Sequence, residues 1–106
     1  MHSFLDLADH SGEEIAALLA LAKRLEQHPE PQALAGKILG LLFFNPSLRT
    51  MSSFQAGMAR LGGSSFVISA GNGTWQLETR RGAIMDGVAA EHVREGVPVL
   101  SHYCDV

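Results

Sequence analysis

Cysteine is nearly absent from this chain of 106 residues, which contains only Cys104. A single thiol cannot form an internal disulfide or a zinc site built from cysteines, and a reduced setting fits it best. Long apolar runs are also lacking, since none approaches the roughly 20 residues that span a bilayer. The first residues have neither the cationic start nor the apolar core of a secretory signal. We therefore expect a cytoplasmic protein without a membrane partner.

Positive charge is scarce as well. Eight Lys and Arg against 11 Asp and Glu give a net charge of −3, and no basic cluster interrupts this balance. Nucleic acids select for dense positive charge, so the sequence predicts no nucleic-acid partner. Hydrophobic residues make up 46% of the chain and charged residues 18%, which is the composition of a folded domain with a core. A small anionic ligand remains compatible, because one local cationic pocket can oppose the net charge.

Helical and strand patterns alternate along the chain. Ser11 and Glu14 are spaced as a capping box, and the apolar repeat behind them should end near His28, before two prolines. The apolar run at 37–44 is typical of a strand covered on both faces. This alternation predicts an α/β fold with a parallel sheet flanked by helices. The other expected elements are a helix over about 50–61 that the pair Gly62-Gly63 should stop, a strand over 65–69, and a long loop over 71–87. A last helix is expected over 91–105, and Pro98 should kink it or shift its start.

Polar residues gather where the first strand ends and the second helix begins. In a parallel sheet this is where ligands bind, and a helix N-terminus supplies free N–H groups and partial positive charge. Arg49 adds a planar guanidinium suited to an oxyanion, while Ser47, Thr50 and Ser52 add hydroxyl donors. The segment is therefore predicted to hold a phosphate-like group. The alternative is that the serines only cap the helix and that Arg49 is a solvated charge.

The same segment resembles the Ser-x-Arg-Thr signature of the aspartate/ornithine carbamoyltransferase family. The match is carried by FFNPSLRT at 43–50, and VLSHYCD at 99–105 resembles the family's VLSxYxD helix end. The resemblance covers the whole chain but only the N-terminal part of a complete enzyme. It implies that residues 1–106 are an incomplete carbamoyl phosphate-binding domain without the C-terminal amino-acid-binding domain. We expect such a chain to be inactive alone.

Trp75 narrows the resemblance to one branch of the family. The stretches GTWQLE at 73–78, MDG at 85–87 and EHV at 91–93 are similar to those of N-acylornithine carbamoyltransferases. In that branch the tryptophan loop reaches into the carbamoyl phosphate site of a neighbouring subunit in a homotrimer. An exposed Trp on a glycine-rich loop suits that role, because it needs a partner to bury against. The alternative is that Trp75 folds back onto its own core.

The resemblance implies carbamoyl transfer from carbamoyl phosphate to the side-chain amine of N-acetyl-L-ornithine, in arginine biosynthesis. Ser47, the Leu48 backbone, Arg49 and Thr50 would bind carbamoyl phosphate. Arg49 and Thr50 would be catalytic, through charge neutralisation at the leaving phosphate and donation to the carbonyl oxygen. No cofactor or metal is implied. Ala90 does not identify the acyl group of the substrate, so N-succinylornithine carbamoyltransferase is an alternative, and ornithine carbamoyltransferase is another. A non-catalytic anion-binding module is an alternative from a different functional class.

One departure from the family concerns the helix that follows the signature. Many relatives have an Arg and a Glu where this chain has Met51 and Gln55. The spacing is that of a helix ion pair, and both charges are absent together. We infer that the pair is structural and has been replaced by a neutral one, which leaves Arg49 as the phosphate ligand.

Overall fold

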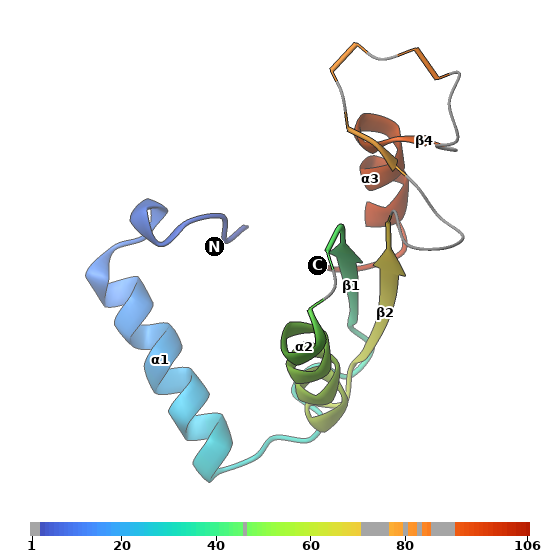
Figure 1. Cartoon of the computed structure of the whole chain (residues 1–106). Helices are drawn as coiled ribbons and strands as arrows, with labels where there is room; N and C mark the ends of the chain where they lie inside the picture. Colours follow the sequence, from blue (N-terminus) through green and yellow to red (C-terminus); the bar gives the residue numbers. More distant parts are fainter. Residues whose placement is uncertain (1–2, 46, 71–76, 80, 83, 86–90) are drawn as a thin grey trace. The chain divides into compact units, whose positions relative to one another are not determined.

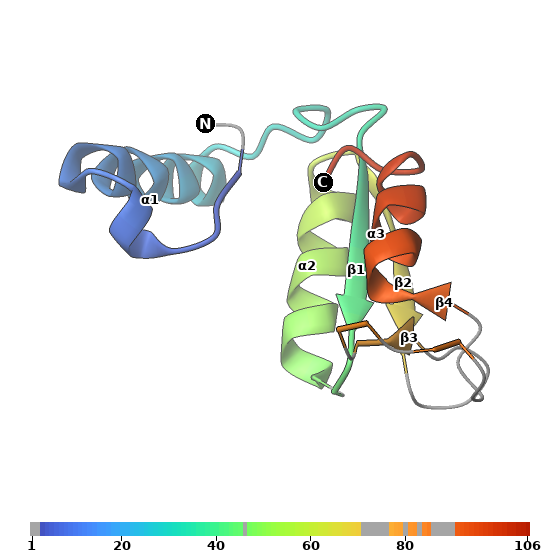
Figure 2. The same ribbon diagram turned by 90° about the horizontal axis from the view of Figure 1, so that it is seen from above.

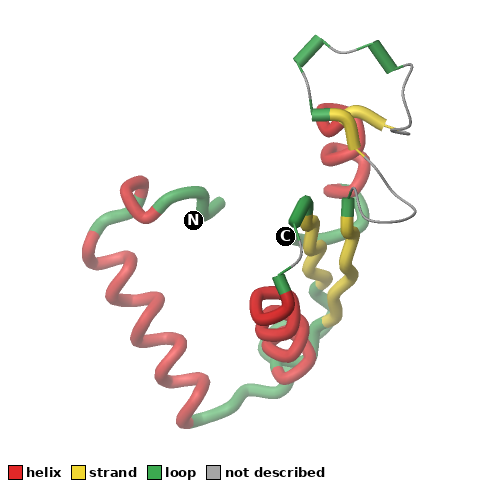
Figure 3. Tube along the Cα trace, in the orientation of Figure 1, coloured by secondary structure: helices red, strands yellow, loops and turns green. Residues whose placement is uncertain are grey.

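The structure is a computed structural model that describes residues 3–45, 47–70, 77–79, 81–82, 84–85 and 91–106. The chain forms two units, Met1–Glu30 and Pro31–Val106. The elements, coloured by type in Figure 3 and mostly labelled in Figure 1, are η1 Leu7–Asp9, α1 Gly12–Gln27, β1 Ile38–Phe43, α2 Leu48–Arg60, β2 Ser64–Ser69, β3 Leu77–Glu78, β4 Glu91–His92 and α3 Val93–Ser101.

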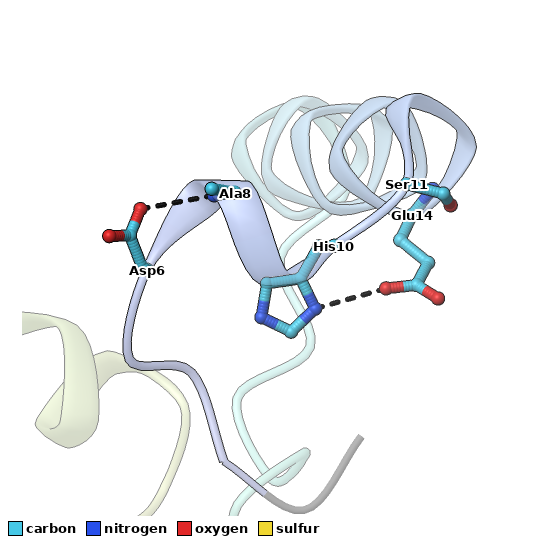
Figure 4. Close-up of polar contacts among 5 residues, drawn as sticks. All are labelled: Asp6, Ala8, His10, Ser11 and Glu14. Atoms are coloured by element: carbon cyan, nitrogen blue, oxygen red, sulfur yellow. Dashed lines mark hydrogen bonds and ion pairs between the residues drawn. The ribbon is translucent and has the colours of Figure 1, made fainter.

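The first unit consists of η1 and α1, and its capping contacts are drawn in Figure 4. Ser11 is the N-cap of α1, and its hydroxyl accepts a hydrogen bond from the Glu14 backbone N–H at 3.1 Å. The Glu14 carboxylate lies 3.0 Å from Nδ1 of His10, whose ring stacks on Phe4 with centroids 4.6 Å apart. The helix ends at Gln27, with His28 as its C-cap. The predicted N-cap Ser11 and the predicted end of this helix are confirmed, whereas the Glu14 side chain bonds His10 and does not complete the predicted capping box.

The second unit is built on β1 and β2, which pair in parallel with Ile38 opposite Ser64 and Phe43 opposite Ser69. Side chains of successive β1 residues point to opposite faces of this sheet. Phe54 and Met58 of α2 gather with Leu39 of β1, whereas Val97 and Leu100 of α3 gather with Gly40 and Leu42. The two helices therefore cover opposite faces, as Figure 2 shows on either side of β1. The predicted parallel sheet flanked by helices is confirmed.

Helix α2 begins two residues earlier than the predicted start at 50, and its end has a clear steric cause. Leu61 is the C-cap, and the next residue, Gly62, has a φ of 85°. A side chain is strained in this left-handed region, and a Cβ here would also collide with the carbonyl oxygen of Pro31. The prediction that the glycine pair stops the helix is confirmed.

The segment predicted as a helix over 91–105 is only partly helical. Glu91 and His92 form β4, which pairs in parallel with β3, and α3 runs only from Val93 to Ser101. The His92 ring accepts a hydrogen bond from the Arg94 backbone N–H at 3.1 Å, so His92 acts as the N-cap. Pro98 lies inside α3. Of the two expectations for this proline, a kink or a shifted start, the shifted start is observed. Much of the predicted loop over 71–87 lies outside the described residues, and β3 falls within it.

Burial is much lower than the composition predicted. Ala70 is the one apolar side chain that is fully buried in the part of the chain that the structure describes. Large apolar side chains remain open to solvent, among them Leu19 on α1 at 68% exposure and Phe54 on α2 at 51%. The expectation of a closed hydrophobic core is therefore wrong for this chain. Across the described ranges, no helix combines the length and apolarity needed to cross a bilayer.

Candidate anion-binding site

The predicted anion site lies at the carboxyl end of β1. The strand ends at Phe43, and α2 begins at Leu48 with Ser47 as its N-cap. The order of the elements thus places the turn at the sheet edge where parallel sheets bind their ligands. Four of the residues predicted to bind the anion, Ser47 to Thr50, form one continuous stretch here, and all four are exposed.

The N-terminus of α2 is not capped by a side chain. Ser47 makes no capping hydrogen bond, and its hydroxyl instead donates to Oγ1 of Thr50 at 2.8 Å. The first backbone bond of the helix runs from the Met51 N–H to the Ser47 carbonyl oxygen at 3.0 Å. Among the described residues, no acceptor is found for the backbone N–H groups of Leu48, Arg49 and Thr50. The prediction that Ser47 might only cap the helix is therefore wrong.

The contrast with α1 shows that this open end is specific to α2. In α1 the N-cap Ser11 does bond a first-turn N–H, and Glu13 and Glu14 place negative charge in the first turn. The first turn of α2 contains no acidic residue. Negative charge at a helix N-terminus is favourable, worth about 0.3–1 kcal/mol on an exposed surface. The first turn of α2 leaves that place open for an external anion.

Arg49 adds full positive charge to the same turn. It is the second residue of α2 and is exposed. In the described ranges no carboxylate lies within ion-pairing distance of its guanidinium, since the ion pairs found there join His10 with Glu14 and Arg24 with Glu30. A planar guanidinium can form a bidentate contact with a phosphate or carboxylate. The side chain of Leu48 is 74% exposed and apolar, so only its backbone N–H suits this task.

Two further residues of α2 make side-chain hydrogen bonds near the turn, and the sequence patterns did not single them out for this purpose. The Ser53 hydroxyl donates to the Thr50 carbonyl oxygen at 3.0 Å. Gln55 Nε2 lies 3.4 Å from the Ser65 hydroxyl, which links α2 to β2. The inferred neutral pair joined Gln55 with Met51, whereas the partner that the structure gives the Gln55 side chain is Ser65 on the sheet. The spacing of Ser53 three residues after Thr50 was the available signal for its contact, because hydroxyls often bond carbonyls one turn back.

The chemistry available at this turn is electrostatic. It offers N–H donors, hydroxyls and one guanidinium, which together stabilise negative charge on a bound group. Over the residues that the structure describes, no group of three or more His, Cys, Asp or Glu side chains could hold a metal ion. Ser52, predicted as a further hydroxyl donor, is an exposed residue of α2, and Trp75 lies outside the described residues.

Comparisons with known proteins point to one family. N-acetylornithine carbamoyltransferase of Xylella fastidiosa is 40% identical over 103 residues, which cover 97% of this chain and 31% of that protein. N-succinylornithine carbamoyltransferase of Bacteroides thetaiotaomicron is 47% identical over 70 residues, which cover 66% of this chain and 22% of that one. The chain therefore spans less than a third of the length of these relatives.

Solved structures agree with these relatives. A crystal structure of a mutant N-acetyl-L-ornithine transcarbamylase complexed with carbamyl phosphate and N-succinyl-L-norvaline is 39% identical, with a TM-score of 0.89 over 98% of this chain and 31% of that one. A second, an acetylornithine transcarbamylase complexed with acetylcitrulline, gives a TM-score of 0.88 at 38% identity over the same shares. The expected fold is thereby confirmed.

The family description that matches is "Aspartate/ornithine carbamoyltransferase, carbamoyl-P binding domain", and it matches residues 2–106. That range covers nearly the whole chain and includes both units of the structure. This chain belongs to the aspartate/ornithine carbamoyltransferase family.

Proposed function

We propose that this chain is the carbamoyl phosphate-binding part of a carbamoyltransferase, and that the turn from Ser47 to Thr50 holds the phosphate group. The observation that carries the proposal is the first turn of α2, which has no side-chain cap and contains Arg49, a residue with no ion pair among the described residues. Support from the family is that a structural relative was solved with carbamyl phosphate bound. The chain spans less than a third of the length of these relatives, and we expect residues 1–106 alone to be inactive.

The proposed reaction needs charge stabilisation and positioning. The side-chain amine of the acceptor attacks the carbonyl carbon of carbamoyl phosphate, a C–N bond forms, and the C–O bond to phosphate breaks. Phosphate leaves with the electron pair of that bond, and the amine loses a proton. Arg49 and the first-turn N–H groups would stabilise the phosphate, and the Thr50 hydroxyl would donate to the carbonyl oxygen. Loss of one such preorganised donor typically costs about 3 kcal/mol of transition-state stabilisation.

The acceptor that we propose is N-acetyl-L-ornithine, which places the reaction in arginine biosynthesis, in the cytoplasm. Its support is that relatives matching 97% of this chain are named N-acetylornithine carbamoyltransferase. A second candidate is N-succinylornithine, because the succinylornithine enzymes reach 47% identity over their shorter match. Ala90, the residue expected near the acyl group, lies outside the described residues. Parallel assays with the two acylated ornithines and with free ornithine, on a protein with both domains, decide among them.

Trp75 is the residue that we expect to come from a second subunit. We expect this residue to reach the carbamoyl phosphate site of a neighbouring subunit in a homotrimer. The support is the resemblance of residues 73–78 to the N-acylornithine branch. Mixing a Trp75→Ala protein with an Arg49→Ala protein tests it. If each trimer site uses Trp75 from one subunit and Arg49 from another, mixed trimers recover part of the activity that both parent variants have lost.

The direct test of the site is calorimetric titration with carbamoyl phosphate and, separately, with inorganic phosphate. Arg49→Ala should abolish binding of both. Arg60→Ala is the matched control, because Arg60 is an exposed arginine in the last turn of the same helix. Equal affinity of the parent and Arg49→Ala would remove the proposed site. Phosphate binding without carbamoyl transfer to any ornithine derivative, in a protein with both domains, would favour the non-catalytic anion-binding module.

A further inference from the structure

The first turn of α3 is capped by an imidazole ring. His92 is the N-cap, and its Nδ1 accepts the Arg94 backbone N–H at 3.1 Å. A ring nitrogen accepts a hydrogen bond only while it carries no proton, so the neutral ring has its proton on Nε2. In α1 the same role belongs to the hydroxyl of Ser11, which accepts whatever the pH. The cap of α3 therefore depends on the charge of its residue, whereas the cap of α1 does not.

Two residues of α3 make the helix depend strongly on this cap. The helix has nine residues, and Gly96 and Pro98 are among them. Proline has no N–H, so the carbonyl oxygen of Arg94 cannot accept the usual helical bond from residue 98. Glycine loses more backbone freedom in a helix than any other residue. Because a helix this short gains little from its own backbone bonds, the cap contributes a large part of the stability of the first turn.

Protonation of His92 acts against this turn in two ways. It converts Nδ1 into a donor, which removes the acceptor of the Arg94 N–H. It also places a positive charge at a helix N-terminus, where positive charge is unfavourable. Both effects have the same sign, so the stabilisation by the neutral ring is present at higher pH and is lost as the pH falls. Histidine is the side chain that ordinarily changes its charge between about pH 5 and pH 8.

Charged residues on three elements surround the ring. They are Arg94 and Glu95 of α3, Glu91 of β4, and Glu78 of β3, which is opposite His92 in the pairing of the two strands. His92, Arg94 and Glu95 also line a hollow of about 240 Å³, whose other lining residues, Gly82 and Met85, are uncharged. The surrounding charges affect the pH at which the ring titrates. None of them returns a lone pair to a protonated Nδ1, so the loss of the cap follows in every case.

We propose that His92 is a pH-sensitive cap, which holds the first turn of α3 while its ring is neutral and releases that turn when the ring is protonated. The hollow changes with it, because the cap and two residues of this turn form much of its lining. His102, the C-cap at the other end of α3, has the opposite effect, since positive charge is favourable at a helix C-terminus. The device acts on the fold of the chain and needs no substrate.

Nuclear magnetic resonance on the whole chain, from about pH 8 to about pH 5, tests this cap directly. At the upper end, the ring nitrogen shifts of His92 should place the proton on Nε2. As the ring titrates, the Arg94 amide should lose about fivefold in protection against exchange, corrected for the intrinsic rate, which corresponds to one capping bond. The buried Ala70 amide, which donates to Phe43 O at 2.8 Å, is the internal reference and should keep its protection. A proton on Nδ1 at pH 8, or constant Arg94 protection through the titration, would overturn the proposal.

Three variants separate the cap from other effects of acid. His92→Asn keeps an N-cap acceptor that does not titrate, so Arg94 should stay protected over the whole pH range. His92→Ala should leave Arg94 unprotected at every pH, and His102→Asn should retain the pH dependence of the parent. Loss of protection in His92→Asn at the same pH as in the parent would assign the effect to another group and contradict the proposal. The asparagine variant and the ring shifts decide the matter even if His92→Ala fails to fold.

Discussion

The hydroxyl groups of Ser47 and Thr50 lie 2.8 Å apart and share a hydrogen bond across the first turn of α2. Ser47 occupies the N-cap position, yet its hydroxyl donates to another side chain and does not accept a hydrogen bond from a first-turn N–H group of the helix. A capping hydrogen bond typically contributes about 1 kcal/mol, which this helix forgoes. Local rules of this kind are often broken where the freed groups serve a function, and here they suit an anion.

Replacing Ser47 by aspartate should separate stability from binding. In Ser47→Asp the carboxylate can accept a first-turn N–H and interact with the helix dipole, so α2 should gain about 1 kcal/mol. The same carboxylate repels an external anion and occupies its donors. We expect a higher thermal midpoint together with loss of phosphate binding by calorimetry.

The control for that experiment is Ser11→Asp, since Ser11 already caps α1 and acidic residues already occupy its first turn. This variant should change neither the thermal midpoint nor phosphate binding appreciably. Retention of parental phosphate affinity by Ser47→Asp would show that the anion does not use the amides of α2.

Substituting Arg49 by lysine should reveal whether the guanidinium fork matters beyond its charge. Lysine keeps the positive charge but offers a point donor in place of two parallel N–H groups. We expect phosphate affinity of Arg49→Lys to fall between those of the parent and Arg49→Ala. Affinity equal to the parent would mean that charge alone suffices at this position, as measured by the same titration at fixed ionic strength.

Alanine substitutions at two turn glycines should lower the free energy of unfolding by different amounts. Gly62 has a φ of 85° and no space for a Cβ beside the Pro31 carbonyl, whereas Gly36 has a φ of 79° with open space around it. Alanine at Gly62 should lower the free energy of unfolding by more than about 1 kcal/mol, and alanine at Gly36 by less.

Gly12→Ala completes this series, because Gly12 has open space and no positive φ. We expect this change to be neutral or slightly stabilising, since alanine favours a helix over glycine. Urea unfolding followed by circular dichroism measures all three variants. A cost at Gly36 equal to that at Gly62 would show that the contact with Pro31 adds nothing.

Removal of the Ser11 hydroxyl should weaken the start of α1. Ser11→Ala loses the 3.1 Å bond to the Glu14 N–H, and the loss of such a cap costs about 1 kcal/mol. Amide exchange in the first turn of α1 should speed accordingly. Ser52→Ala, an exposed serine on α2, is the control and should leave α1 unchanged. Unchanged exchange at Glu14 in Ser11→Ala would contradict the capping role.

The start and end of α1 could be predicted from the sequence because their causes are local. Ser11 caps a backbone group three residues away, and the helix ends at Gln27 just before the prolines. The same holds for β1 and for the glycine stop of α2, where an apolar run or a missing Cβ acts on its own neighbourhood. Local physics also placed the turn with Arg49 at the start of a helix.

The start of α3 could not be predicted in the same way. Glu91 and His92 lie in a strand because Leu77 and Glu78 pair with them, and that partner is distant along the chain. A helical repeat in a single segment carries no information about a partner of this kind. The low burial is a similar case, since apolar side chains predict a core only if neighbouring elements close over them.

The sequence by itself determined α1, the strands β1 and β2, the helix α2, the family signature and the chemical character of the turn from Ser47 to Thr50. Only the tertiary structure decided that the Ser47 hydroxyl bonds Thr50 in place of a backbone N–H. It also decided that Asp105 returns to the edge of β1 to bond Ile38, which lies 67 residues earlier. Helices and turns follow from interactions between near neighbours, whereas such pairings depend on which segments meet once the chain has folded.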